Sequence, residues 1–204
     1  MTTSPASQSN NPPENDAVFF TRLRRAGVGL RSSEFVLHQF TTPEIRDTES
    51  KWWDQFQAEK ARLGSGMLDV LLGPRGRGKT TLACMLIGCC CWRGQRPIYT
   101  TAADMARQIR LGFDEKADQQ SRFESADLLV IDEYNRVAET EWADITTQEI
   151  IDKRYSHLRD TLLVTNMTTD AFLRGFNTSI RSRISQCGKI LLLDGEDFRT
   201  GGGK

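Results

Sequence analysis

The 204-residue chain has no net charge, because 27 Lys and Arg residues balance 27 Asp and Glu residues. A neutral chain has no overall field that would draw it to nucleic acid or to a membrane surface, so any DNA contact has to come from a local basic patch. The sequence also has no hydrophobic run long enough to span a bilayer: its strongest apolar cluster, residues 84–92, is about half of the required length. The length suits one globular domain with its own core.

Histidines and paired cysteines are scarce as well. The two histidines, His38 and His157, are isolated in the sequence and indicate neither a metal site nor acid–base chemistry. Three of the five cysteines are consecutive, and consecutive helical residues point about 100° apart, so they cannot converge on one metal. No CxxC spacing occurs and the count is odd, which argues against a disulfide framework and favours small buried helix residues. The stretch 1–16 lacks the order of a signal peptide and predicts a disordered tail on a cytoplasmic protein.

Short apolar segments alternate with helical segments from residue 67 onward. Strands are expected at residues 67–72, 97–101, 128–131, 161–165 and 189–193, and helices at 79–92, 102–111 and 141–158, with a polar helical stretch before the third strand. Near-continuous apolar strands separated by helices predict an α/β fold with a parallel sheet covered on both faces. Amphipathic helices at 17–25 and 43–63 predict a helical extension over 17–63, followed by the α/β domain at 64–200 and a flexible end at 201–204.

A phosphate-binding motif, G-x-x-x-x-G-K-[ST], lies where the first strand meets the first helix of this domain. Its glycines allow a tight turn whose N–H groups face the β-phosphate, and the helix N-terminus adds partial positive charge. Lys79 is expected to reach the β- and γ-phosphates, and Thr80 to coordinate Mg²⁺, with Thr81 as a packing neighbour. The residues expected to bind ATP are Gly73, Pro74, Arg75, Gly76, Arg77, Gly78, Lys79, Thr80 and Thr81.

Two further strands end in polar side chains at the edge of the sheet where open α/β sheets bind ligands. Asp132 and Glu133 follow residues 128–131; Asp132 is expected to hold Mg²⁺ through a water molecule, and Glu133 to accept a proton from the attacking water. Asn166 follows residues 161–165, where it either orients that water or caps the next helix. The motifs together predict ATP hydrolysis with catalytic roles for Lys79, Glu133 and Asn166.

These motifs, in this order and spacing, resemble the AAA+ helicase loaders of the DnaC/DnaI family over residues 24–199. The likeness includes residues 101–105, 127–133 and 150–154. The resemblance implies a P-loop AAA+ (ASCE) domain with a five-stranded parallel sheet flanked by helices and no complete C-terminal lid domain. It also implies that subunits assemble into a spiral or ring with ATP between neighbours.

The resemblance further implies two arginines that complete the site. Residues 179–184 are similar to the motif that carries an arginine finger into the neighbouring subunit's site, and Arg183 fits the finger position best. Arg181 is the alternative, because Ser179 stands where the family has a second arginine. Arg199 is expected to be the sensor that contacts the nucleotide of its own subunit.

The partners implied by the resemblance are a DnaB-type hexameric helicase and single-stranded DNA, and so compact a loader would suit a phage or prophage. Family members hold DNA through the helices between the second and third strands, where this chain mixes basic and acidic residues: Arg107, Arg110, Lys116, Asp114, Glu115 and Asp118. The helix with Phe19, Phe20 and Leu23 either binds the helicase or packs on the ATPase domain. Two other functions remain open: an IstB-like transposition ATPase acting on duplex DNA, and a nucleotide-binding module that inhibits a host helicase.

Overall fold

A parallel sheet forms the centre of the protein. The computed structural model describes residues 15–42, 50–111, 116–134, 141–175 and 178–194. The strands are β1 (Leu68–Leu72), β2 (Ile98–Thr101), β3 (Leu128–Asp132), β4 (Asp160–Val164) and β5 (Ile190–Leu192). They pair in the order β2-β3-β4-β1-β5, and every pairing is parallel. The predicted α/β fold with a five-stranded parallel sheet is confirmed.

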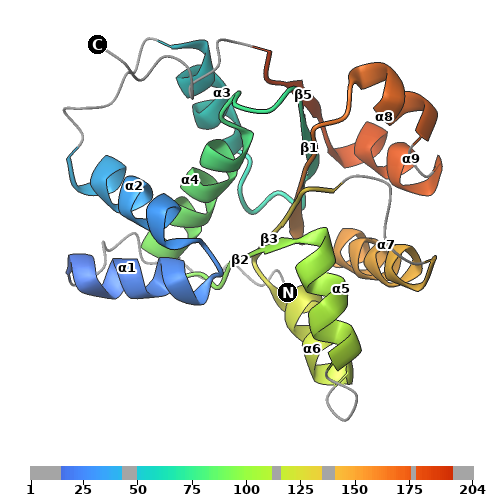
Figure 1. Cartoon of the computed structure of the whole chain (residues 1–204), viewed down its shortest axis with the longest axis horizontal. Coiled ribbons are helices and arrows are strands. Elements are labelled where there is room, and N and C mark those ends of the chain that lie inside the picture. Colours follow the sequence, from blue (N-terminus) through green and yellow to red (C-terminus); the bar gives the residue numbers. More distant parts are fainter. Residues whose placement is uncertain (1–14, 43–49, 112–115, 135–140, 176–177, 195–204) are drawn as a thin grey trace, which may run out of the picture.

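Helices cover both faces of this sheet (Figure 1). One face carries α1 (Asp16–Arg25), α2 (Leu30–Thr41), α3 (Lys51–Lys60) and α4 (Lys79–Trp92). The other carries α5 (Ala102–Leu111), α6 (Lys116–Ser125), α7 (Glu141–Ser156), α8 (Thr169–Gly175) and α9 (Thr178–Cys187). None of the described helices is both long enough and apolar enough to cross a membrane.

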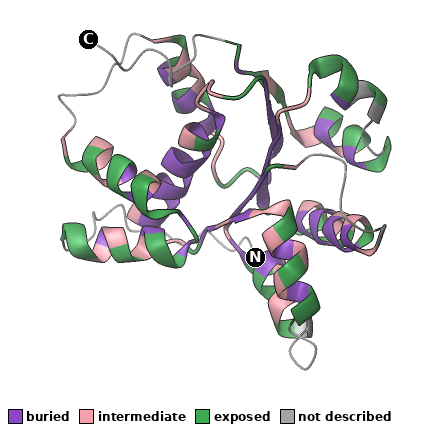
Figure 2. Cartoon of the chain, in the orientation of Figure 1, coloured by how far each residue is buried: buried purple, intermediate pink, exposed green. Residues whose placement is uncertain are grey.

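The strands are buried on both faces because each side of the sheet has its own hydrophobic core. Side chains alternate along β1: Leu71 faces the core on the α4 side, whereas Val70 and Leu72 face the core on the α7 side. Figure 2 shows buried residues along the central strands and α4, with exposed residues on the outer helices. The cysteines of α4 are buried, which confirms the interpretation of small core residues. This sandwich holds the carboxyl ends of the strands in fixed relative positions.

The N-terminal helices pack on α4. Phe19 and Leu23 are fully buried, and the Phe19 ring lies 5.2 Å from the rings of Phe40 and Trp92. Of the two alternatives for α1, the structure therefore supports packing on the α/β domain for these two side chains, because they are not accessible to a partner. Helix α2 was not predicted from sequence; it is held against α4 where Gly88 leaves room for Phe40.

Some predicted boundaries move. The helix predicted at 43–63 is α3, which ends at Lys60, and residues 43–49 lie outside the described residues. The helix predicted to end at residue 158 ends at Ser156, because Leu158 adopts a left-handed backbone conformation with φ +52°.

Away from the phosphate loop, the buried side chain of Arg154 forms hydrogen bonds with segments that are distant in the sequence. Arg154 of α7 is fully buried and donates hydrogen bonds to the carbonyl oxygens of Phe123, Ala126 and Asp160. Burial lowers the pKa of Arg154 to about 9. Its Nε atom also donates to the Thr161 hydroxyl at 3.0 Å. Arg154 thereby joins α7 to α6, to the segment before β3 and to the start of β4.

Candidate functional site

A pocket of about 440 Å³ opens at the carboxyl edge of the sheet. It is lined by Arg75, Gly76, Arg77, Gly78, Lys79, Thr80, Thr81, Asp132, Glu133 and Asn166. These residues follow β1, β3 and β4, which are neighbours in the order β3-β4-β1. Since β4 lies between the other two strands, Asn166 comes between the acidic pair and the phosphate loop. The structure thus brings the three polar motifs to one pocket.

The phosphate loop is held against the last strand. A Cβ atom added at Gly73 would lie 2.1 Å from the carbonyl oxygen of Leu193, so only glycine allows this approach. Gly78 has φ +77° and is the N-cap residue of α4, with no side chain to cap the helix. The first turn of α4 therefore presents its N–H groups to the pocket without a side-chain acceptor from the N-cap, as anion-binding helix N-termini do.

Lys79 is fixed by the loop that precedes it. Its side chain is buried, and Nζ donates hydrogen bonds to the carbonyl oxygens of Gly73 at 2.7 Å and Pro74 at 2.6 Å. Gly73 and Pro74 were predicted to contact ATP, but they do not line the pocket; they hold the lysine. These bonds hold the ammonium group against the phosphate loop, in a residue that lines the pocket, where a phosphate oxygen can replace a carbonyl oxygen as its acceptor.

Two further features of the phosphate loop involve Arg77 and Trp52, of which Trp52 was not expected from the sequence. The Arg77 Nε atom is buried and has no hydrogen-bond partner within the described part of the chain, which fits an anionic ligand in this pocket. The Trp52 indole of α3 donates to the Gly78 carbonyl oxygen at 3.3 Å. Trp52 thus links the N-terminal helices to the phosphate loop.

Asp132 is oriented by three donors. Its Oδ2 atom accepts hydrogen bonds from the Thr80 hydroxyl at 2.8 Å and the Tyr99 hydroxyl at 2.6 Å, and Oδ1 accepts from the Glu133 N–H at 2.7 Å. Burial and the Asp132 charge raise the pKa of Tyr99, so its hydroxyl remains a donor. Mg²⁺ prefers oxygen ligands and keeps several waters, which suits a hydroxyl and a carboxylate at this spacing. Thr80 and Asp132 therefore fit a Mg²⁺ site, and sequence reasoning missed Tyr99.

Glu133 has an unusual backbone for a non-glycine residue. Its φ is +53°, in the left-handed region, and the residue is exposed to the pocket. After Glu133, the main chain is again hydrogen-bonded to β4, because the Tyr134 N–H donates to the carbonyl oxygen of Val164, the last residue of β4, at 2.8 Å. Such conformations cost about 1–3 kcal/mol and occur at functional sites. Glu133 thus follows the last residue of β3 and lines the pocket.

Of the arginines implied by the family resemblance, the two that the structure describes lie outside this pocket. Arg183 of α9 does not line this pocket; it forms an ion pair with Asp152 of α7, and its guanidinium lies 5.3 Å from the Tyr155 ring centroid. Arg181 lines a separate pocket of about 320 Å³. Arg199 lies outside the described residues.

The basic residues expected along DNA are only partly described. Arg107 of α5 forms an ion pair with Asp104 at 2.6 Å, and Arg110 is exposed. Asp114 and Glu115 lie outside the described residues, as does the side chain of Lys116. Of the three basic residues predicted here, Arg107 is therefore neutralised by a neighbouring acid and the side chain of Lys116 is not described.

Comparison with known proteins adds a family. The family model described as IstB-like ATP binding protein matches residues 66–199. This range includes the phosphate loop, the acidic pair and Asn166, and it is more than half of the chain. No curated protein matches the chain.

Solved structures share the fold. The DnaC helicase loader matches with a TM-score of 0.62 and 17% identity, over 73% of this chain and 92% of that one. DnaI matches with a TM-score of 0.62 and 16% identity, over 76% and 89%. AMPPCP-bound DnaA from Aquifex aeolicus matches with a TM-score of 0.61 and 20% identity, over 76% of this chain and 50% of DnaA, so the chain spans about half of the DnaA length. The predicted AAA+ P-loop fold is confirmed.

Proposed function

Because this chain belongs to the family of IstB-like ATP-binding proteins, we propose that it is a cytoplasmic AAA+ ATPase that assembles with copies of itself and loads a DnaB-type replicative helicase onto single-stranded DNA. The observation that carries the ATPase proposal is the convergence of Lys79, Thr80, Asp132, Glu133 and Asn166 on one pocket. Phosphoryl transfer needs little covalent chemistry from the protein, so catalysis depends on positioned charges of this kind.

Within the pocket, the loop residues hold the triphosphate. Lys79 and the N-terminal N–H groups of α4 bind the β- and γ-phosphate oxygens, and Arg77 adds a buried donor. Thr80 and Asp132 hold Mg²⁺, which neutralises charge on those oxygens when bound. Tyr99 keeps the Asp132 carboxylate oriented toward Thr80.

The water that attacks the γ-phosphate is placed by the ends of β3 and β4. Glu133 accepts its proton, because the carboxylate is exposed to the pocket next to the metal residues. Asn166 orients the same water and donates to a γ-phosphate oxygen. Water is favoured as the acceptor over a metabolite hydroxyl because an acidic residue and an amide flank the position that it would occupy.

The site is completed by a neighbouring subunit. Arg183 lies away from its own pocket and is held by Asp152, which keeps the guanidinium on the surface formed by α7 and α9. In the assembly, Arg183 exchanges Asp152 for the γ-phosphate of the adjacent subunit, and Arg199 contacts the nucleotide in its own subunit. An arginine supplied in this way accelerates phosphoryl transfer by a factor on the order of 10³ to 10⁵.

The experiment that tests this mechanism is ATP hydrolysis measured against protein concentration. Turnover per molecule should be very slow in dilute protein and should rise as subunits associate. Arg183→Ala should remove this rise while leaving ATP binding intact, whereas Arg174→Ala, a change at an exposed arginine of α8, should leave the rise unchanged. A rate per molecule that stayed constant on dilution to monomers would refute the shared site.

The loading step is proposed from the similarity to the DnaC helicase loader and to a DnaA structure bound to single-stranded DNA. Addition of single-stranded DNA and a DnaB-type helicase should stimulate hydrolysis, and Glu133→Gln should stop loading while retaining ATP binding. If the variant still blocks the helicase as well as the wild type does, the chain is an inhibitory module instead.

A second candidate function is transposition, favoured by the family match to IstB-like proteins. An IstB-like ATPase acts on duplex DNA beside a transposase. Stimulation of hydrolysis by duplex but not by single-stranded DNA would favour this function over helicase loading.

A further inference from the structure

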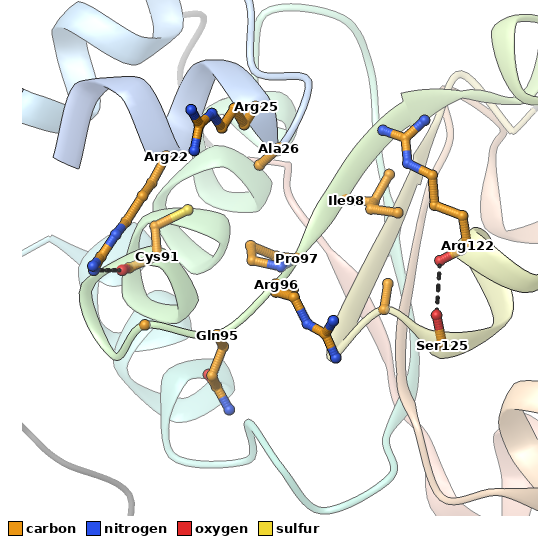
Figure 3. A pocket seen from close by; sticks show the side chains of 12 residues that line it. Arg22, Arg25, Ala26, Cys91, Gln95, Arg96, Pro97, Ile98, Arg122 and Ser125 are labelled. Carbon is orange, nitrogen blue, oxygen red and sulfur yellow. Dashed lines mark hydrogen bonds between the residues drawn. The ribbon is translucent and has the colours of Figure 1, made fainter. Parts of the chain in front are cut away.

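A second pocket lies at the opposite end of the sheet from the phosphate loop. Its volume is about 440 Å³, and it is formed by the end of α1, the segment from α4 into β2, and the end of α6. Figure 3 shows these three segments around the start of β2, with Pro97 and Ile98 in the centre. Because the strands are parallel, the start of β2 is remote from the carboxyl edge that carries Lys79 and Asp132.

This pocket is strongly basic. Its lining includes Arg22 and Arg25 of α1, Arg96 before β2 and Arg122 of α6, and no acidic residue. We call it the arginine pocket. Since the whole chain is neutral, four arginines around one hollow are a local excess of positive charge. Such an excess attracts anions at short range even where the molecule as a whole has no field.

The charge is not balanced by nearby acids. None of the four arginines forms an ion pair within the described residues. The acids next to the pocket in sequence have other cationic partners: Glu124 pairs with Lys153 at 2.8 Å, and Asp127 pairs with Arg159 at 3.0 Å. Asp127 also accepts a hydrogen bond from the Arg96 main-chain N–H at 2.8 Å, but it forms no ion pair with the Arg96 guanidinium. Among the described residues, Arg22 alone of the four donates a side-chain hydrogen bond, to the Cys91 carbonyl oxygen at 3.1 Å near the end of α4. Arg25, Arg96 and Arg122 are exposed and available to a ligand.

The lining specifies what kind of anion fits. Guanidinium groups bind phosphate oxygens through paired N–H donors. Apart from the amide of Gln95, the rest of the lining is small or aliphatic, and it includes no aromatic ring on which a base could stack. Single-strand binding proteins stack bases on such rings, so this pocket offers contacts to the sugar–phosphate backbone and no stacking contact to a base.

An extended acidic peptide fits less well. A peptide strand would add to the free edge of β2, the outermost strand of the sheet. The turn after α1 already occupies that edge, because the Tyr99 N–H donates to the Ala26 carbonyl oxygen at 2.6 Å. The remaining surface offers guanidinium groups but no free main-chain ladder.

We propose that the arginine pocket binds the phosphodiester backbone of single-stranded DNA. The inference rests on the proposed DNA contact and places it in the hollow between α1, β2 and α6, in place of the outer face of α5. That face is the weaker candidate, since Arg107 is already paired with Asp104. The three parts of the pocket come from segments far apart in the chain, so the site exists only in the folded protein.

The test compares two arginine pairs in the full-length protein. Arg25→Gln with Arg122→Gln removes two exposed pocket arginines and leaves the Arg22 cap in place. Arg107→Gln with Arg110→Gln makes the same charge change on α5. Binding of a labelled oligothymidine is measured by fluorescence anisotropy over a salt series, without nucleotide. Unchanged melting temperatures confirm that both variants fold.

For single strands, each phosphate contact makes the plot of log K against log salt steeper by about 0.7. The Arg25→Gln, Arg122→Gln variant should therefore have a slope that is shallower by about 1.4, and it should bind at least tenfold more weakly at low salt. The α5 pair should bind like wild type. The inference would be overturned if the Arg25→Gln, Arg122→Gln variant bound oligothymidine as tightly as the wild-type protein does. It would also be overturned if the wild-type protein bound oligoglutamate but not oligothymidine. Without DNA, the Arg25→Gln, Arg122→Gln variant should hydrolyse ATP at the wild-type rate. If the wild-type protein did not hydrolyse ATP at all, that result would count against the proposed function and not against DNA binding in the arginine pocket.

Discussion

Tyr99→Phe is the sharpest test of how the metal residues are organised. The substitution keeps the ring and removes the hydroxyl that donates to Asp132 Oδ2 at 2.6 Å. Asp132 is 6% exposed, so the lost donor is replaced poorly by solvent. A hydrogen bond to a charged group is worth about 1.5–3 kcal/mol, and a partner that orients a metal-binding group changes metal affinity by about 10–100-fold.

The expected result is a Mg²⁺ concentration for half-maximal ATP hydrolysis about 10-fold or more above that of wild type, together with a lower melting temperature. For a chain of this length, each kcal/mol corresponds to about 2–4 °C. Both quantities are measurable on the same protein, by a Mg²⁺ titration of hydrolysis and by calorimetry.

Tyr155→Phe is the matched control. Its hydroxyl donates to Gln186 at 2.5 Å on the surface, so this variant should keep the Mg²⁺ requirement of wild type. An unchanged Mg²⁺ requirement in Tyr99→Phe would refute the conclusion that Tyr99 positions Asp132 for the metal. An equal change in the Mg²⁺ requirement of both variants would show that the effect is not specific to the Tyr99 hydroxyl.

Two further substitutions test the buried parts of the fold. Burial, and then the neighbouring Asp69, raise the pKa of Glu59 from 4.5 to about 8, so its contribution to stability is present below pH 4.5 and is lost as the pH rises through 8. Glu59→Gln should remove this pH-dependent loss of stability. Between pH 4.5 and 8, the melting temperature of the wild-type protein should therefore fall relative to that of the variant. Melting curves that shifted in parallel with pH would contradict the raised pKa of Glu59. Gly73→Ala should destabilise the protein by about 2–4 kcal/mol in denaturant unfolding, because its Cβ would meet the Leu193 carbonyl oxygen. Gly29→Ala, whose Cβ meets nothing within 4 Å, should lose only about 0.5–1 kcal/mol, the cost of alanine at the N-cap of α2, and similar losses in both would argue against the contact.

Local patterns predicted most of the elements. Helices α4 and α5 have the predicted bounds, and each strand lies within about one residue of its predicted position. These segments could be predicted because apolar periodicity and glycine punctuation act between residues close in the chain. Helices α2, α8 and α9 were not predicted. Helix α2 has apolar residues on one face, but its N-cap is Gly29, which provides no side-chain cap, and contact with α4 stabilises it.

The candidate site divides in the same way. The loop residues and the acids at the end of β3 are adjacent in sequence and have a recognisable motif. Tyr99 and Trp52 have no motif: Tyr99 reaches Asp132 because β2 pairs with β3, and Trp52 reaches Gly78 because α3 packs beside α4. Phe19 and Leu23 could be read as a partner-binding face or a core face until their burial was known.

The sequence alone was enough to identify a phosphate loop, two polar strand ends and an alternating α/β chain, because each depends on contacts within a few residues. The order β2-β3-β4-β1-β5, the donors around Asp132, the pairing of Arg183 with Asp152 and the gathering of four arginines at the start of β2 were decided by tertiary structure. The physical reason is that strand order and helix packing are selected by burial of the two hydrophobic cores as a whole, and this burial brings together side chains that no local pattern relates.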